Sequence, residues 1–358
     1  MEESRFPGVE RKRGHYESFY VKACRPGGGQ GVWIRHTVHK RPGEDPKGSI
    51  WFTLFDGDAP APRATKVTVP AGRLSSPEGS WIRVADAEIG PGRANGSIET
   101  EALSASWEMT FDGDAEPCRY LPADWLYEAP VPRTKFEAPY PDARFEGTLR
   151  VDADEIEIGS WPGMIGHNWG SEHAERWVWL EGTGFEGHGT YLDAGAARIK
   201  LGPVRSPWIA AGTLVLDGES HRLGGFGRIR ASKISETATA CEFVLPGDGL
   251  SVRGWIAAPA KDFVGWVYAD PKGPEHNVVN CSIADLELMV EREGQPPRRL
   301  SLKGGGAYEF GMRETDHGIR SSPTPTGEFE QRPLHRLDAA VKLALCPSSR
   351  PTTCSPAP

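Results

Sequence analysis

Apolar and polar residues alternate with a period of two along several stretches of this chain, the pattern that puts every second side chain on one face of a β-strand. The clearest stretches are residues 19–21, 32–38, 50–54 and 103–111. Between and around them stand dipeptides typical of tight turns, Asp56-Gly57, Pro91-Gly92, Asn95-Gly96 and Asp112-Gly113. The pattern predicts short antiparallel strands joined by hairpins, without the strand–helix alternation of a parallel sheet.

Strands of the same kind continue through the second half of the chain, over residues 148–310. Helical periodicity is confined to two short stretches, residues 123–127 and 337–345. We therefore predict an all-β protein with little helix, in which two sets of antiparallel strands close into two barrel-like domains in tandem.

A proline-rich segment, residues 129–143, is the natural boundary between the two predicted domains. It contains Pro130, Pro132, Pro139 and Pro141. Because proline cannot donate a hydrogen bond to a neighbouring strand, we expect a stiff, extended linker here. The predicted domains are then residues 1–128 and 144–320. Pro, Ser and Thr dominate after residue 320, so we expect residues 321–358 to form a disordered tail.

Composition agrees with a turn-rich β protein, since 43 of the 358 residues are Gly and 31 are Pro. Lys and Arg number 41 against 49 Asp and Glu, a formal net charge of −8, so we expect no nucleic-acid partner. Residues 1–13 lack an apolar run, and no stretch approaches the roughly 18 apolar residues of a membrane span. We expect neither a signal peptide nor a transmembrane segment, and hence a cytoplasmic location. The sequence does not define the oligomeric state.

Cysteine and tryptophan narrow the possibilities further. The 6 cysteines are scattered without zinc-site spacing, which favours free thiols in a reducing compartment. The 12 tryptophans either fill a core or line a ligand pocket. Four of them, Trp161, Trp169, Trp177 and Trp179, lie within residues 161–179. Trp177 and Trp179 share one strand face, where they fill the barrel interior or, with Asn168, contact a ligand.

The same run contains the candidate catalytic residues. His167 and Trp169 are two residues apart, so a strand puts both on one face and Asn168 on the other. Tyr191 and Asp193 have the same spacing further along the chain. If these two strands are neighbours, one wall of a barrel presents an imidazole, an indole, a phenol and a carboxyl together.

Such a set suits acid-initiated chemistry at an alkene. A carboxyl enclosed by aromatic rings is desolvated, which raises its pKa, so Asp193 could stay protonated and act as a general acid. The resulting tertiary carbocation could be stabilised by the faces of Trp169 and Tyr191, by roughly 1–2 kcal/mol of cation–π attraction. His167 could position water or return the proton. The structural alternative has a solvated Asp193 at a strand end, the aromatic residues in the core and His167 bonded to the backbone.

Metal and cofactor chemistry is not indicated. His167 and His173, even with Glu172 and Glu175 nearby, lack the spacing of a helical zinc site, so we predict no metal. The glycine clusters lack the flanks of a phosphate-binding loop, so we predict no cofactor. Turn and capping roles are predicted for His276, Asn277 and Asn280.

The His-Asn-Trp-Gly at residues 167–170, followed by Tyr-x-Asp at residues 191–193 on a mostly-β chain, resembles the carotenoid 1,2-hydratase (hydroxyneurosporene synthase) family. That family belongs with tocopherol-cyclase-like and related two-domain, lipocalin-like proteins. The resemblance covers roughly residues 161–193. It implies two lipocalin-like barrels, an isoprenoid-like apolar ligand, and catalytic roles for His167, Trp169, Tyr191 and Asp193, with Asp193 as the proton donor.

Three functions remain open at this point. The chain could hydrate or cyclise an apolar, isoprenoid-like molecule by acid catalysis, or it could carry or sense such a ligand without reaction. It could also be a carbohydrate-binding or glycoside-processing protein, which needs two carboxylates facing one cleft. Asp193 and His167 facing one apolar cavity favours the enzyme, whereas Asp193 bound to an arginine in a sealed pocket favours the carrier.

Overall fold

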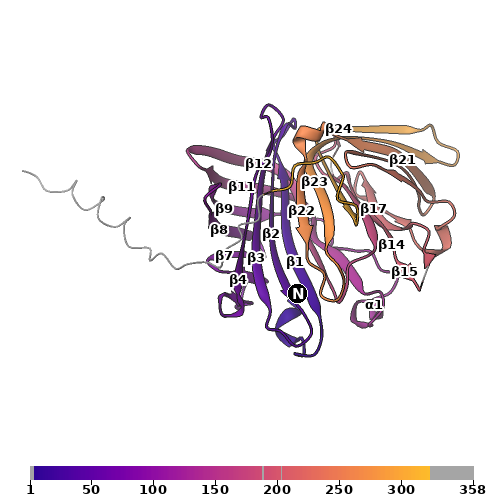
Figure 1. Ribbon diagram of the computed structural model, residues 1–358. Helices are drawn as coiled ribbons and strands as arrows, with labels where there is room; N and C mark the ends of the chain where they lie inside the picture. Colours follow the sequence, from indigo (N-terminus) through magenta and orange to yellow (C-terminus); the bar gives the residue numbers. More distant parts are fainter. Residues whose placement is uncertain (1–3, 188, 203, 323–358) are drawn as a thin grey trace, which may run out of the picture. The chain divides into compact units, whose positions relative to one another are not determined.

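Two antiparallel β-sheets contain almost all of the regular structure (Figure 1). The computed structural model describes residues 4–187, 189–202 and 204–322. One sheet is nearly closed into a barrel and the other is curled into a half-barrel. The prediction of an all-β protein with two antiparallel, barrel-like parts is therefore confirmed.

The first sheet contains 12 strands, drawn from residues 15–170. Its order is β4-β3-β2-β1-β12-β11-β9-β8-β7-β6-β5, and β10 pairs with β11. The bounds are β1 His15–Cys24, β2 Gln30–Lys40, β3 Lys47–Asp56, β4 Arg63–Pro70, β5 Leu74–Ser75, β6 Ile82–Val84, β7 Ala87–Gly90, β8 Arg93–Glu99, β9 Ser104–Asp112, β10 Cys118–Arg119, β11 Thr134–Val151 and β12 Asp154–Gly170.

The second sheet contains 10 strands, drawn from residues 176–312. Its order is β18-β17-β14-β13-β24-β23-β21-β20-β19, and β22 pairs with β23. The bounds are β13 Arg176–Gly182, β14 Tyr191–Arg198, β17 Ile209–Leu216, β18 Glu219–Gly224, β19 Lys233–Glu236, β20 Ala240–Pro246, β21 Leu250–Ala257, β22 Val264–Tyr268, β23 His276–Arg292 and β24 Arg298–Met312. A separate pair is formed by β15 Lys200–Leu201 and β16 Val204–Arg205.

Helix is sparse in the described part of the chain. The α-helix α1, Trp125–Glu128, overlaps the predicted stretch, and 3₁₀ turns occur at Phe6–Gly8, Ala71–Arg73, Phe226–Arg228 and Ala260–Asp262. None of these is long or apolar enough to cross a bilayer. The second predicted helix, and the predicted tail from residue 323 onward, lie outside the described residues.

The proline-rich segment is not a linker between the sheets. Most of it is the first part of β11, which pairs with β12 in the first sheet. That pairing shifts register three times, and the first two shifts lie around Pro139 and Pro141; a missing N–H is tolerated at such irregularities. The chain leaves the first sheet only after β12, so it passes between the sheets at residues 171–175 and not at residues 129–143.

One of the predicted turns, Asn95-Gly96, lies inside a strand. Asn95 and Gly96 lie within β8, where Gly96 is opposite Trp107 of β9. A Cβ at Gly96 would lie 2.3 Å from Cβ of Ala87 and 2.8 Å from the Trp107 ring. Close packing, and not a turn, therefore requires this glycine, whereas Pro91-Gly92 does join β7 to β8 as predicted.

Strands β1 and β12 bury side chains on both faces. Phe19, Val21 and Ile165 point into the hydrophobic core of the first sheet. On the opposite face Lys22 pairs with Glu181 of β13, with 2.7 Å between nitrogen and oxygen, and both side chains are fully buried. We name the contact region on this face the inter-sheet layer; it contains Tyr20, Lys22, Tyr120, Met164, Trp179, Glu181, Tyr191 and Asp193.

Candidate active site

Asp193 is a buried acid in the inter-sheet layer. It lies in β14, opposite Glu181 of β13, and only 3% of it is exposed. Its chain neighbours Leu192 and Ala194 belong to the core of the second sheet. Strand alternation therefore turns Asp193 toward the first sheet.

Two neutral groups hydrogen-bond the Asp193 carboxyl. The Tyr120 hydroxyl donates to Oδ2, and Nε1 of Trp179 donates to Oδ1 at 2.8 Å. Burial raises the pKa of Asp193 to about 7, although these hydrogen bonds and the charge of Lys22 oppose the rise and Glu181 adds to it. Near neutral pH the carboxyl is therefore present in both protonation states, which suits general acid–base catalysis.

Aromatic rings surround this carboxyl. Tyr20 meets Trp179 edge to face, with 5.5 Å between ring centroids, and Tyr120 stacks on Phe136 at 4.5 Å. Tyr20 lies across the backbone of Gly166, where a Cβ would be 2.1 Å from the ring. Glycine at this position is what allows so close an approach. The apolar cluster is completed by Ala138, Met164 and Val215.

Tyr191 shares the strand face of Asp193, but its hydroxyl lies 3.3 Å from Sγ of Cys118. Burial raises the pKa of Cys118 to about 11 and that of Tyr191 well above its ordinary value. Both groups are therefore neutral near pH 7. Tyr191 lies in the apolar cluster beside the site, while the hydroxyl bound to Asp193 comes from Tyr120.

His167 and Trp169 lie apart from this site. Strands β12 and β14 belong to different sheets, so the predicted single wall of four side chains is wrong. His167 is stacked between Phe19, at 3.9 Å, and Trp169, at 4.4 Å. The structure brings Tyr191 and Asp193 together and places His167 and Trp169 on the core side of the first sheet.

Two carboxylates hold His167. Its Nδ1 lies 2.9 Å from Oε1 of Glu137, and its Nε2 lies 2.9 Å from Oε1 of Glu17. Burial lowers the pKa of His167, but the hydrogen bonds and charges of Glu137 and Glu17 outweigh it and raise the pKa above its ordinary value. Burial raises the pKa of Glu17, but hydrogen bonds with His15 and His167 outweigh it and bring the pKa to about 2. The result is an imidazolium compensated by carboxylates.

Val178 and Leu180 belong to the core of the second sheet, and Trp177 and Trp179 are half-buried, with Trp177 packed against that core. Trp179 takes part in the site through its hydrogen bond to Asp193. Trp177 instead donates from Nε1 to Oε1 of Glu309, at 2.9 Å.

Two further polar arrangements lie outside the Asp193 site. Asn168, on the opposite face from His167 as predicted, accepts a hydrogen bond from Ser18 at Oδ1. Within residues 4–322 as described, the group of His, Cys, Asp and Glu side chains close enough to share a metal ion is His173, Asp270 and His276.

Sequence reasoning missed several residues of the site. Tyr20 lies on the face of β1 opposite the recognised apolar face, and Tyr120 comes from an irregular segment with no periodicity to read. Lys22 and Glu181 carried a usable signal, since each is a charge with apolar residues on either side, Val21 and Ala23 for Lys22 and Leu180 and Gly182 for Glu181. A charge in such a setting is buried only when it is paired.

These observations define a two-sheet β protein with an aromatic-lined, buried carboxyl between its sheets. No family model matches the chain. Two curated proteins from Mycobacterium tuberculosis, each named only as an uncharacterized protein, are 26% identical to it over 331 residues, covering 90% of this chain and 95% of theirs.

Three solved structures align with most of this chain. A protein from Nitrosomonas europaea that carries the provisional name ATTH aligns with a TM-score of 0.54 at 15% identity, over 87% of this chain and 96% of its own. CghA aligns with a TM-score of 0.49 at 11% identity, over 85% of this chain and 89% of its own. Kievitone hydratase from Nectria haematococca aligns with a TM-score of 0.44 at 10% identity, over 84% and 88%. The likeness to the Nitrosomonas europaea protein is one of fold.

Proposed function

We propose that this chain binds a small, apolar, isoprenoid-like molecule in the inter-sheet layer and hydrates or cyclises it, with Asp193 as the general acid. The observation that carries the proposal is the Asp193 carboxyl, which is buried, accepts hydrogen bonds from two neutral donors, is surrounded by aromatic rings and has a pKa of about 7. A carboxyl in this state holds a proton that it can give to a weak base such as an alkene.

Proton transfer from Asp193 to one alkene carbon forms a C–H bond, breaks the π bond and leaves a carbocation and a carboxylate. The rings of Tyr20 and Trp179 can stabilise the cation by roughly 1–2 kcal/mol each when water is excluded. In hydration, water adds to the cation and then loses a proton to the carboxylate. In cyclisation, a second double bond of the ligand attacks the cation, and the final proton again returns to Asp193. Atoms and charges balance in both reactions, and water is the only co-reactant that hydration needs.

Access to Asp193 depends on the segment between β9 and β11, residues 113–133. This segment carries Cys118 and Tyr120 onto the site. It is fastened to the second sheet by Arg222, whose Nη2 donates to the carbonyl oxygen of Leu121 at 3.1 Å. In the proposed complex the ligand takes the place of the Tyr120 ring beside the carboxyl, so opening of this segment precedes binding.

The test begins with the ligand. Native mass spectrometry of the purified chain identifies a co-purified apolar molecule, and alkenes of that class are then assayed for hydrated or cyclised products. We expect Asp193→Asn to keep ligand binding and to lower turnover by about 10²–10⁴-fold. An unchanged rate would refute the proton-donor role.

Asp262→Asn is the matched control. Asp262 is another buried aspartate, but it pairs with Lys261 at 2.9 Å. Its replacement removes a carboxyl of similar burial outside the inter-sheet layer, so turnover should persist. Equal losses in both variants would indicate a general effect on folding.

A carrier on the same scaffold is the second candidate, favoured by how completely Tyr120 and the surrounding rings cover Asp193. The ion pairs among the described residues do not include Asp193, and the arginine expected for a carrier is not bound to it. Ligand binding by the wild-type chain with no product formation, and unchanged affinity in Asp193→Asn, would establish the carrier.

A further inference from the structure

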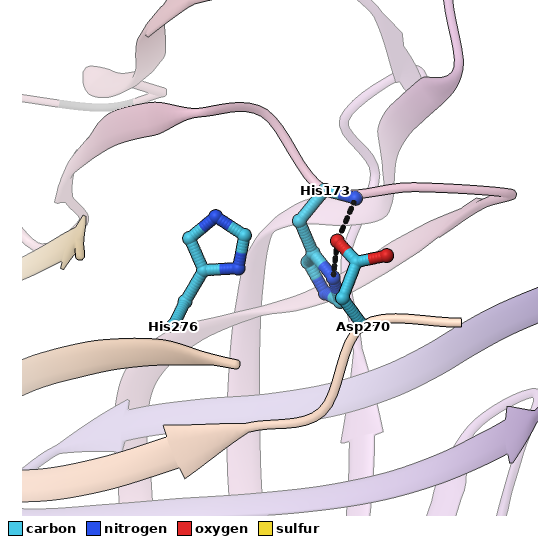
Figure 2. Close-up of side chains that lie close together, drawn as sticks. All are labelled: His173, Asp270 and His276. Carbon is cyan, nitrogen blue, oxygen red and sulfur yellow. Dashed lines mark hydrogen bonds and ion pairs between the residues drawn. The ribbon is translucent and has the colours of Figure 1, made fainter. Parts of the chain in front are cut away.

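Three side chains with metal-ligating atoms converge near the point where the chain passes from the first sheet to the second (Figure 2). His173 lies in the connection of residues 171–175, Asp270 in the turn between β22 and β23, and His276 is the first residue of β23. One ligand atom of each lies within 4.8 Å of the others. We propose that these three side chains bind one divalent transition-metal ion of the Zn²⁺ class.

Asp270 is already oriented for such a role. Its Oδ1 accepts hydrogen bonds from the backbone N–H groups of Lys272 and Gly273, at 3.0 Å and 3.1 Å. Its Oδ2 accepts from the backbone N–H of His173 at 3.0 Å and lies 3.6 Å from Nδ1 of the same residue (Figure 2). Zinc–ligand bonds of about 2.0–2.2 Å put two tetrahedral ligand atoms roughly 3.3 Å apart. This pair therefore needs little movement to share an ion.

The unpaired ring nitrogens of His276 independently indicate a ligand at this point. His276 is fully buried, and neither ring nitrogen makes a hydrogen bond within the described residues. Nδ1 of His173 also makes no hydrogen bond there, although it lies 3.6 Å from Oδ2 of Asp270. Buried polar atoms normally have partners, because an unpaired one destabilises the fold. A metal ion would satisfy an atom on each imidazole at once.

Charged side chains around the cluster affect the expected affinity. The charges of Glu309 and Arg35 act on His173, and the charge of Arg313 acts on His276. The nearby arginines offset part of the negative charge, so we expect an affinity in the micromolar range.

The ligand set selects the metal class. Two imidazoles and one carboxylate suit Zn²⁺, Co²⁺ and Ni²⁺, whereas Mg²⁺ and Ca²⁺ prefer oxygen ligands alone. Aromatic contacts hold the rings in place: Tyr16 stacks on His173 with 3.9 Å between ring centroids, and Trp177 lies at a tilt against His276 with 5.1 Å between centroids. Trp177 in turn lies against Gly311, where a Cβ would be 2.2 Å from its ring. A bound ion would tie the connection between the sheets to the β22–β23 turn.

The test uses the full, tag-free chain after treatment with a chelator. Titration with Zn²⁺ should show one binding site, and a hundredfold excess over Kd should raise Tm by about 3–5 °C. Co²⁺ should give the visible absorption bands of a low-coordinate nitrogen–oxygen site, and Mg²⁺ should do neither. No Zn²⁺ binding up to 100 μM free metal, or Co²⁺ bound without such bands, would overturn the proposal.

His276→Asn and Asp270→Asn should each weaken Zn²⁺ binding by at least tenfold. His221→Gln is the matched control, because His221 is a buried histidine whose Nε2 lies 2.6 Å from Nη2 of Arg292, and binding should be unchanged. Equal affinity in His276→Asn and the wild-type chain would overturn the assignment. If His276→Asn does not fold, the Co²⁺ spectrum of the wild-type chain decides.

Discussion

The two buried ionisable sites on either side of β12, around His167 and around Asp193, have opposite electrostatics. Both groups are almost completely removed from solvent. His167 has a carboxylate at each ring nitrogen, whereas Asp193 has two neutral donors. Opposite charges therefore keep the His167 group ionised, while at Asp193 burial dominates and favours the protonated acid.

This electrostatic difference indicates which of the two sites can exchange a proton with a substrate. A histidine that is hydrogen-bonded to two carboxylates holds three strands together, β1, β11 and β12. Both of its N–H groups already donate hydrogen bonds, so neither is available to a substrate. A carboxyl held by neutral groups near its pKa can release and recover a proton without leaving an unpaired charge. We therefore propose Asp193 as the reacting group and a structural role for His167, although the sequence resemblance implied catalysis by both.

The largest expected effect comes from removing the compensated charge. His167→Ala removes the buried positive charge that Glu17 and Glu137 share, so we expect the free energy of unfolding to fall by about 3–5 kcal/mol. Urea denaturation monitored by circular dichroism measures this loss directly.

His36 provides the matched control for that loss. It is fully buried, lies opposite Phe19 on β2 and makes no hydrogen bond through its ring within the described residues. Burial lowers its pKa to about 3, so the ring is neutral. His36→Leu should therefore change the free energy of unfolding by less than about 1.5 kcal/mol. Equal losses in the two variants would contradict charge compensation.

The fold was predictable wherever the evidence is local. Alternation over residues 32–38 and 50–54 follows the two-residue period of a strand, and both stretches lie in strands. Pro139 and Pro141 misled the prediction because register shifts accommodate them inside β11. The turn predicted at Gly96 was wrong because glycine is favoured both in tight turns and where strands pack closely.

The site was predictable only within single strands. Tyr191 and Asp193 share a face of β14, as their spacing indicates, and both are buried. Their separation from His167 depends on sheet order, which alternation does not encode. The partner of His167, Glu17, lies 150 residues away in the chain, and no local pattern joins two such positions.

The second prediction concerns stability against pH. Because the pKa of Asp193 is raised to about 7, its contribution to stability is complete below the unfolded value of about 4 and is lost as pH rises through 7. This loss is on the order of 4 kcal/mol. Asp193→Asn cannot ionise, so it should be more stable than the wild-type chain at pH 8 and similar to it at pH 4.

Urea midpoints measured from pH 4 to pH 8 test this prediction. His167, whose pKa is also raised, contributes stability that is present below pH 6.5 and lost as pH rises, but it does so in both proteins. Glu17 acts in the opposite direction, losing its contribution as pH falls toward 2. The difference between the two curves therefore isolates Asp193, and parallel curves would contradict its raised pKa.

The third prediction separates the two tyrosines. Tyr120→Phe removes a hydrogen bond that favours the Asp193 carboxylate, so the pKa of Asp193 should rise further, by about one to two units. Tyr191→Phe removes only the contact with Cys118 and should leave that pKa in place. A ¹³C-carboxyl NMR titration, with the Asp193 signal assigned by its loss in Asp193→Asn, measures both. Equal shifts would show that the hydroxyl of Tyr120 has no special role.

The smallest expected effect belongs to Trp169, which the resemblance placed among the catalytic residues. Its ring stacks on His167 and lies under the guanidinium of Arg5 at 5.2 Å. Trp169→Phe keeps an aromatic face on the imidazole, so the free energy of unfolding should fall by about 0.5–1.5 kcal/mol. The pKa of Asp193, and the turnover of any substrate, should not change. A loss of turnover with the pKa of Asp193 unchanged would contradict the separation of the two sites, because it would mean that the cation forms within reach of the indole on the His167 side.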